Sequence, residues 1–140
     1  MDGEALTPLG QPVIWSVGHS TLTPEQFLAL LTPCAIQQVV DIRAYPFSRR
    51  FPWFAQAAMA GWLEAAAVTY RHLPGLGGRR SLHHPDPSLV GGWQNPAFQA
   101  YAAYMQEEAF WQALAELQGQ ARSARTAMMC SEALWWRCHR

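Results

Sequence analysis

The last eleven residues of the chain, from Cys130 to Arg140, hold a concentration of side chains that could do chemistry. Two thiols, a carboxylate, an imidazole and two guanidinium groups follow directly after the short apolar run of residues 126–129. At the end of a parallel strand such groups would lie on the carboxyl edge of the sheet, where open α/β folds build their sites. The pattern therefore predicts a functional site, although it does not identify the substrate.

A nucleophilic thiolate is the first chemistry that these residues could perform. Cys130 would end a strand and precede a loop whose backbone N–H groups favour the thiolate form. Glu132 or Asp41 would act as the base or as an orienting group, and His19 and His139 would carry protons. A thiolate in such surroundings is suited to attack an electrophile. These five residues are the predicted catalytic set of a cysteine-dependent enzyme.

A metal site is the second chemistry. Cys130, Cys138 and His139 are soft ligands suited to zinc or iron, and His19 or Asp41 would complete four-coordination. The sequence contains no Cys-x-x-Cys pair, so a standard structural zinc motif is not predicted. Zinc or iron stays open as a cofactor of a metal-dependent enzyme.

Recognition of an anion without turnover is the third interpretation, and it belongs to a different functional class. Arginine suits bidentate contact with phosphate or carboxylate, and Trp53, Trp135 or Trp136 could stack on a ring. These groups together suit a nucleotide, either free or flipped out of a nucleic-acid strand. The predicted ligand-binding residues are Ser20, Arg43, Arg49, Arg50, Arg79, Tyr104, Arg137 and Arg140.

Structural roles explain several of these residues as well. Free cysteine is one of the most buried residue types, so Cys34 is expected in the core, and Cys130 could share that role. Asp41 could simply pair with Arg43 or Arg49. Convergence of many polar groups on one edge is harder to explain by packing, because each group would need a buried partner.

The composition is that of a folded protein without net charge. The chain has 140 residues, is 50% hydrophobic and 14% charged, and its ten basic residues balance ten acidic ones. A general polyanion binder would be strongly basic, so tight and unspecific duplex binding is not predicted. The length fits one domain, expected over residues 13–140 after an N-terminal extension of residues 1–12.

Cysteine number and hydropathy indicate the compartment. Three cysteines do not make a disulfide framework. The first residues show no signal pattern, and no apolar run approaches the ~20 residues of a membrane span. We therefore expect a cytoplasmic protein without a membrane partner, with thiols that are free or bound to metal.

Short strand-like runs alternate with helical stretches and must position these groups. Strands are expected at residues 13–17, 38–43, 68–73 and 126–130. Helices are expected after residue 23, over residues 55–66 and after residue 95, the last with a break near residues 107–108. This order predicts a single three-layer α/β domain with a mainly parallel sheet of about four strands flanked by helices. The polar residues after the strands would then meet on one carboxyl edge.

Local signals refine these elements. Thr23 is expected as the N-cap of the first helix, with Pro24 at its first position and Gln26 completing a capping box. The third strand alternates in a way that suits an exposed face or a sheet edge, and its His72 is expected to lie on a strand face without a functional role. The long segment of residues 74–94 is expected to be a loop. The expected core positions of the first two helices are Phe27, Leu30, Leu31, Met59, Trp62, Leu63 and Ala66.

Five groups of residues resemble one known family. They are Gly18-His19-Ser20; Asp41-Ile42-Arg43 with Pro46, Ser48, Arg49 and Arg50; Leu73 to Arg79; Tyr101 to Met105; and Cys130-Ser131-Glu132 with Cys138-His139-Arg140. In this order, from Val13 onward, they resemble the family called domain of unknown function 488. The resemblance implies a small α/β protein whose polar motifs share a pocket, without an assigned activity. It also implies a further helix after the Cys-His-Arg motif. We expect that helix to be missing here, which would favour self-association through the uncovered side.

Overall fold

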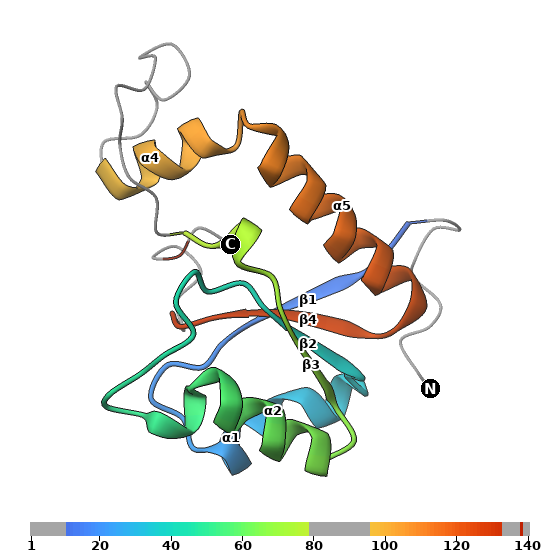
Figure 1. Cartoon of the computed structure of the whole chain (residues 1–140). Coiled ribbons are helices and arrows are strands. Elements are labelled where there is room, and N and C mark those ends of the chain that lie inside the picture. Colours follow the sequence, from blue (N-terminus) through green and yellow to red (C-terminus); the bar gives the residue numbers. More distant parts are fainter. Residues whose placement is uncertain (1–10, 79–95, 133–137, 139–140) are drawn as a thin grey trace.

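A parallel sheet is the centre of the fold. The computed structural model describes residues 11–78, 96–132 and 138. Within them, four strands pair in parallel in the order β1-β4-β2-β3. The strands are β1 (Ile14–Gly18), β2 (Gln38–Asp41), β3 (Thr69–His72) and β4 (Thr126–Cys130). The predicted α/β fold with a parallel sheet of about four strands is confirmed (Figure 1).

The burial of each strand follows from its place in the sheet. Every residue of β2 is buried, and only Met128 of β4 is not. These two strands are covered on both faces and flanked by neighbours, which explains why even the polar residues Gln38 and Asp41 of β2 are buried. In β3 exposed residues alternate with half-buried ones, as the sequence predicts for an edge strand.

Helices cover both faces of the sheet. Figure 1 shows α1 (Pro24–Leu31) and α2 (Gln56–Ala65) on one face, whereas α5 (Glu108–Ser123), preceded by α4 (Pro96–Tyr104), covers the other. The expected break at residues 107–108 is confirmed, because α4 ends at Tyr104 and α5 begins at Glu108. None of the helices in the described segments is long and apolar enough to cross a membrane.

The start of α1 has the predicted chemistry. The Thr23 hydroxyl accepts a hydrogen bond from the Gln26 backbone N–H at 3.1 Å, and the Gln26 side chain accepts one from the Thr23 N–H at 2.9 Å. This reciprocal capping box satisfies two backbone donors that the helix itself cannot. A 3-10 turn, η2 (Thr32–Cys34), follows the helix at Pro33.

The apolar faces of the two helices are only partly as expected. Phe27 and Leu31 of α1 and Met59 and Leu63 of α2 are buried. Leu30 was expected in the core and is 52% exposed. Successive helical residues turn by about 100°, so Leu30 faces solvent beside the buried Leu31. Ala66 follows the end of α2 and is also exposed, and Trp62 is half-buried.

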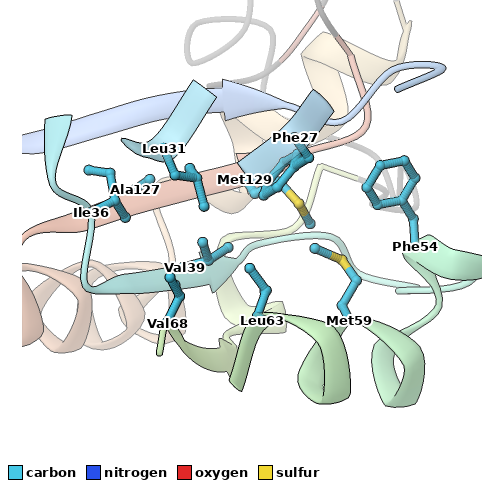
Figure 2. Close-up of a cluster of buried hydrophobic side chains, with 10 residues drawn as sticks. All are labelled: Phe27, Leu31, Ile36, Val39, Phe54, Met59, Leu63, Val68, Ala127 and Met129. Carbon is cyan, nitrogen blue, oxygen red and sulfur yellow. The ribbon is translucent and has the colours of Figure 1, made fainter. Parts of the chain in front are cut away.

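The sheet separates two hydrophobic cores. Figure 2 shows the first, between the sheet and the α1–α2 layer. It contains Phe27, Leu31, Ile36, Val39, Phe54, Met59, Leu63, Val68, Ala127 and Met129. The second core joins the opposite face of the sheet to α4 and α5, with Val40, Ile42, Leu73, Leu76, Tyr101, Tyr104, Phe110, Ala113, Leu117 and Cys130. Neighbouring residues of β2 and β4 alternate between the two cores, as strand geometry requires.

Gly77 lies where the chain after β3 crosses the chain after β2. A Cβ atom on Gly77 would lie 2.7 Å from the backbone nitrogen of Ala44 and 2.9 Å from its Cα. We expect Gly77→Ala to lower the free energy of unfolding in urea by about 1–3 kcal/mol, because backbone must shift to make room. The matched control is Gly61→Ala in α2, where a Cβ meets nothing within 4 Å. It should raise stability by about 0.5–1 kcal/mol. Equal effects of the two changes would contradict the close approach.

Candidate functional site

Backbone hydrogen bonds extend the sheet beyond its strands and position the polar residues at its carboxyl edge. The His19 N–H donates to the Cys130 carbonyl at 3.0 Å, and the Ser20 N–H donates to the Ser131 carbonyl at 2.9 Å. On the other side of β4, the Ile42 N–H donates to the Met129 carbonyl at 3.0 Å. Since β4 lies between β1 and β2, Cys130 is flanked by the residues that end both strands.

Asp41 is fully buried and holds Arg43 in a fixed orientation. Its Oδ1 accepts from the Arg43 backbone N–H at 3.0 Å and from Nε at 2.9 Å, while Oδ2 accepts from Nη2 at 2.7 Å. The Tyr70 hydroxyl also donates to Oδ2. Burial, and then the Asp41 charge, raise the pKa of Tyr70 far above its usual range, so Tyr70 stays protonated and remains a donor. A bidentate carboxylate–guanidinium pair of this kind is strongly directional.

The two terminal nitrogens of Arg43 have different surroundings, and Nη1 does not contact Asp41. Its Nη2 also donates to the Phe54 carbonyl at 2.7 Å. One Nη1 hydrogen points to His19 Nε2 at 3.3 Å. The second Nη1 hydrogen has no partner among the residues described here, although Arg43 is only 7% exposed. A buried guanidinium with a spare donor is a fixed binding group for an acceptor.

His19 has a defined tautomer. Nδ1 lies 2.9 Å from the Ser20 carbonyl, which can only accept, so Nδ1 carries the proton. Nε2 is therefore the acceptor that faces Arg43. The ring stacks on Phe54 with centroids 4.3 Å apart. Ser20 has a left-handed backbone with φ of 45°, which turns the chain after β1 and presents its carbonyl to the ring.

The pKa of His19 predicts a pH-dependent stability. Burial lowers the pKa of His19 below its ordinary value of 6.5, and the Arg43 charge lowers it further, whereas the Ser20 hydrogen bond and the Asp41 charge oppose this. Below pH 6.5 the unfolded chain therefore binds a proton that the folded chain does not. We expect the free energy of unfolding to fall as pH falls from 6.5 to the lowered pKa, and this contribution to be complete above 6.5.

Urea unfolding of the wild type and of His19→Gln, at about pH 7.5, 6.5 and 5.5, measures this effect. The variant should lose less stability between the two lowest pH values, because residue 19 no longer titrates. A pH dependence identical to that of the wild type would contradict the assignment.

Two sulfur atoms lie on the opposite side of the edge. Cys130 Sγ and Cys138 Sγ are 2.8 Å apart. The Glu132 backbone N–H donates to Cys130 Sγ at 3.4 Å, and the thiol can donate to the Glu132 carbonyl at 3.7 Å. Cys130 is 3% exposed and belongs to the second core, whereas Cys138 is half-buried.

One cavity is lined both by His19 and Arg43 and by the two cysteines. It has a volume of about 380 Å³, and its described lining comprises His19, Arg43, Ala44, Tyr45, Phe47, Ser48, Gly78, Ala97, Phe98, Cys130, Ser131, Glu132 and Cys138. His19 and Arg43 contact Phe54 of the first core, and Cys130 belongs to the second. The cavity therefore straddles the carboxyl edge of the sheet, with a nitrogen-rich part on one side and a sulfur-containing part on the other.

Several predicted site residues lie elsewhere. Arg49 and Arg50 are exposed and are not part of the cavity lining, and Arg50 lies over the Phe51 ring. Tyr104 is buried in the second core and donates to the Gly75 carbonyl at 2.7 Å. Ser20 contributes backbone contacts. The other predicted site and stacking residues lie outside the described part of the chain: Arg79, Trp135, Trp136, Arg137, His139 and Arg140.

Three aromatic residues at the cavity were missed by the sequence analysis. Tyr45 and Phe47 are 68% and 67% exposed, and Phe98 of α4 is half-buried. The run Tyr45-Pro46-Phe47, which follows Asp41-Ile42-Arg43 after one alanine, was the available signal, because it places two aromatic side chains next to a polar strand end. Trp53, which was expected to stack on a ligand, is half-buried against the first core and donates to the Leu22 carbonyl at 2.9 Å.

His72 also has a task that was not expected. Its Nε2 lies 2.7 Å from the Arg43 carbonyl and donates a hydrogen bond to it. It thereby ties the edge strand β3 to the chain segment that leaves β2. His72 lies on β3, as expected, and the sequence did not indicate this structural hydrogen bond.

The described thiols fit a metal ion poorly. Two thiolates bound at ~2.3 Å to one tetrahedral zinc lie roughly 3.7 Å apart, whereas these two sulfur atoms are 2.8 Å apart. Within residues 11–78, 96–132 and 138, no three His, Cys, Asp or Glu side chains converge so that they could hold a metal. The third predicted ligand, His139, lies outside these residues. The geometry is that of a thiol pair, and no step is assigned to a metal.

Comparison with known proteins gives the family of the chain. No curated protein and no solved structure is significantly similar to this chain. A family model with the description "Domain of unknown function DUF488" matches residues 23–140.

Proposed function

The chain belongs to the family of domain of unknown function DUF488, and from its cavity we propose an enzyme that acts on an anionic, ring-containing ligand of the nucleotide class. Cys130 is the proposed nucleophile, and Arg43 is the proposed anion-binding group. The observation that carries the proposal is the shared cavity. A buried guanidinium with a spare donor and a sulfur atom line the same space.

Arg43 supports the anion part of the ligand. Its orientation is fixed before binding by Asp41 and the Phe54 carbonyl, so little side-chain entropy is lost when an acceptor arrives. Asp41 neutralises the charge of Arg43. Arg43 would therefore bind the ligand mainly through a directed hydrogen bond, and long-range electrostatic attraction would contribute less. In this proposal Asp41 positions Arg43 and does not act as a base, since its oxygens already accept four hydrogen bonds.

The aromatic rim supports the ring part of the ligand. Tyr45 and Phe47 are far more exposed than aromatic residues that serve packing. Stacking of a base on such a side chain contributes about 1–3 kcal/mol. The cavity volume of about 380 Å³ also falls in the range of ~300–1,000 Å³ that small-molecule sites have.

Cys130 supports the catalytic part. The Glu132 N–H donates to its sulfur and would stabilise a thiolate there, and Glu132 also lines the cavity, where its carboxylate is the proposed base. His19 serves as a neutral acceptor that keeps Nη1 of Arg43 in place. The proposed proton-carrying role of His139 and the anion contacts of Arg79, Arg137 and Arg140 are parts of the same hypothesis.

A binding module without turnover is the second candidate. The burial of Cys130 in the second core favours it, because a core cysteine is often only a small apolar side chain. Arg43 and the aromatic rim would then recognise a nucleotide, or a nucleotide within a single strand, without any chemistry at the thiol.

A panel of nucleoside mono- and diphosphates, with inorganic phosphate, separates the two candidates. Binding is measured by calorimetry and turnover by mass spectrometry of the nucleotides, for the wild type, Cys130→Ser and Phe47→Ala. The enzyme predicts that Cys130→Ser binds as the wild type does and forms no product. A binding module predicts that no variant turns over any nucleotide. If no nucleotide and no phosphate binds, or if Phe47→Ala leaves binding unchanged, the cavity is not the proposed site.

A further inference from the structure

We propose that Cys130 and Cys138 form a redox-active dithiol that reduces small disulfides at the cavity. This inference goes beyond the function proposed above and does not depend on the identity of the anionic ligand. It rests on the contact between the two sulfur atoms and on the opening of the cavity to both.

The distance between the sulfur atoms carries the inference. At 2.8 Å, Cys130 Sγ and Cys138 Sγ lie closer than unbonded sulfur atoms usually do. A disulfide bond of ~2.05 Å needs a further approach of under about 1 Å. The two residues are eight positions apart in the chain, so the closed loop is short and its closure costs little entropy.

The two cysteines differ in solvent exposure. Both cysteines line the cavity, but Cys138 is half-buried and Cys130 is buried. Because Cys138 is the more exposed of the two, a small disulfide is expected to react with it first. Cys34 is an internal control, because it is half-buried like Cys138. It packs beside the first core, whereas Cys130 belongs to the second.

The reaction is a pair of thiol–disulfide exchanges. The thiolate of Cys138 attacks one sulfur of a small disulfide such as oxidised glutathione. Its S–S bond breaks, a mixed disulfide forms on Cys138, and the first glutathione leaves as a thiolate. Cys130 then attacks Cys138 Sγ, which gives the Cys130–Cys138 disulfide and releases the second glutathione. The protein loses two electrons and two protons, and one disulfide becomes two thiols.

The experiment treats the whole chain with oxidised glutathione, stops the reaction with iodoacetamide and maps each cysteine by peptide mass spectrometry. The wild type should form the Cys130–Cys138 disulfide at least about tenfold faster than Cys34 forms any disulfide, because the second exchange is intramolecular. Cys130→Ser should stop at a stable mixed disulfide on Cys138. Cys138→Ser should form no internal disulfide.

Two results overturn the dithiol. One is that the wild type forms no Cys130–Cys138 disulfide, so that both residues either carry glutathione or remain reduced, and are modified no faster than Cys34. The other is a Cys130→Ser variant in which Cys138 is modified no more than Cys34. These readouts follow the modification of cysteines, whereas the proposed function is tested by nucleotide binding and turnover, so the two proposals can fail separately. Loss of the dithiol with retained nucleotide binding would leave the proposed function standing, and the reverse result would leave the dithiol standing.

Discussion

Replacement of Arg43 by methionine should lower the free energy of unfolding by about 3–5 kcal/mol. Asp41 is fully buried and receives three of its hydrogen bonds from Arg43. The side-chain change removes two of them and leaves a buried carboxylate opposite an apolar side chain. The cost arises mainly from this uncompensated charge. Equilibrium urea unfolding followed by circular dichroism measures it.

Two further variants show whether the unpaired charge is the cause. Arg50→Met changes an exposed arginine to the same residue and should alter stability by no more than about 0.5 kcal/mol. The double variant Asp41→Asn with Arg43→Met removes both charges and should be more stable than Arg43→Met alone. A double variant that is less stable than Arg43→Met would show that the pair is not coupled as described.

Replacement of Phe54 by alanine should cost about 3–5 kcal/mol of stability. Phe54 ends the 3-10 turn η3 (Pro52–Phe54), is fully buried, and lies between the stacked ring of His19 and the rings of Phe27 and Trp62. Its side chain belongs to the first core (Figure 2). The change leaves a cavity there, and it also removes the surface that orients His19. Urea unfolding gives the loss of stability.

Phe47→Ala is the matched control for Phe54→Ala, because the same atoms are removed from an exposed side chain at the cavity. Its stability should stay within about 0.5 kcal/mol of the wild type. Similar losses from the two changes would mean that Phe47 also belongs to the packed core. In that case the aromatic rim could not serve as a binding surface.

The alternation of strands and helices was sufficient to predict the fold. The five apolar or β-favouring residues 126–130 predict a strand, and the structure gives the same bounds. The start of α1 was predicted equally well, since Thr23, Pro24 and Gln26 act through contacts within one turn. The burial of individual helix residues depends on tertiary packing and was harder to predict from the sequence. Leu30 has the right residue type for the core but lies on the wrong side of its helix.

The candidate site was predictable in outline for a related reason. Parallel strands bring their carboxyl ends together, so His19, Arg43 and Cys130 were expected on one edge, and they line one cavity. The alternation of side chains along a strand also predicts on which face of the sheet each of these residues lies. Asp41 and Arg43 are two apart and share a side of the sheet, whereas register places Cys130 on the other side. The short distance from Cys130 to Cys138 could not be predicted, because Cys138 lies beyond the last predicted strand and no periodic pattern fixes its position.

The most direct test of the cavity is the rate at which iodoacetamide alkylates Cys130 in reduced protein, with and without each nucleotide or phosphate probe. Peptide mapping gives the rates at Cys130 and Cys34 in the same sample. We predict that at least one nucleotide slows alkylation of Cys130 at least about tenfold, leaves Cys34 unaffected, and gives no protection in Phe47→Ala. Unchanged alkylation of Cys130 with every probe would contradict a ligand site that contains both the thiol and Arg43.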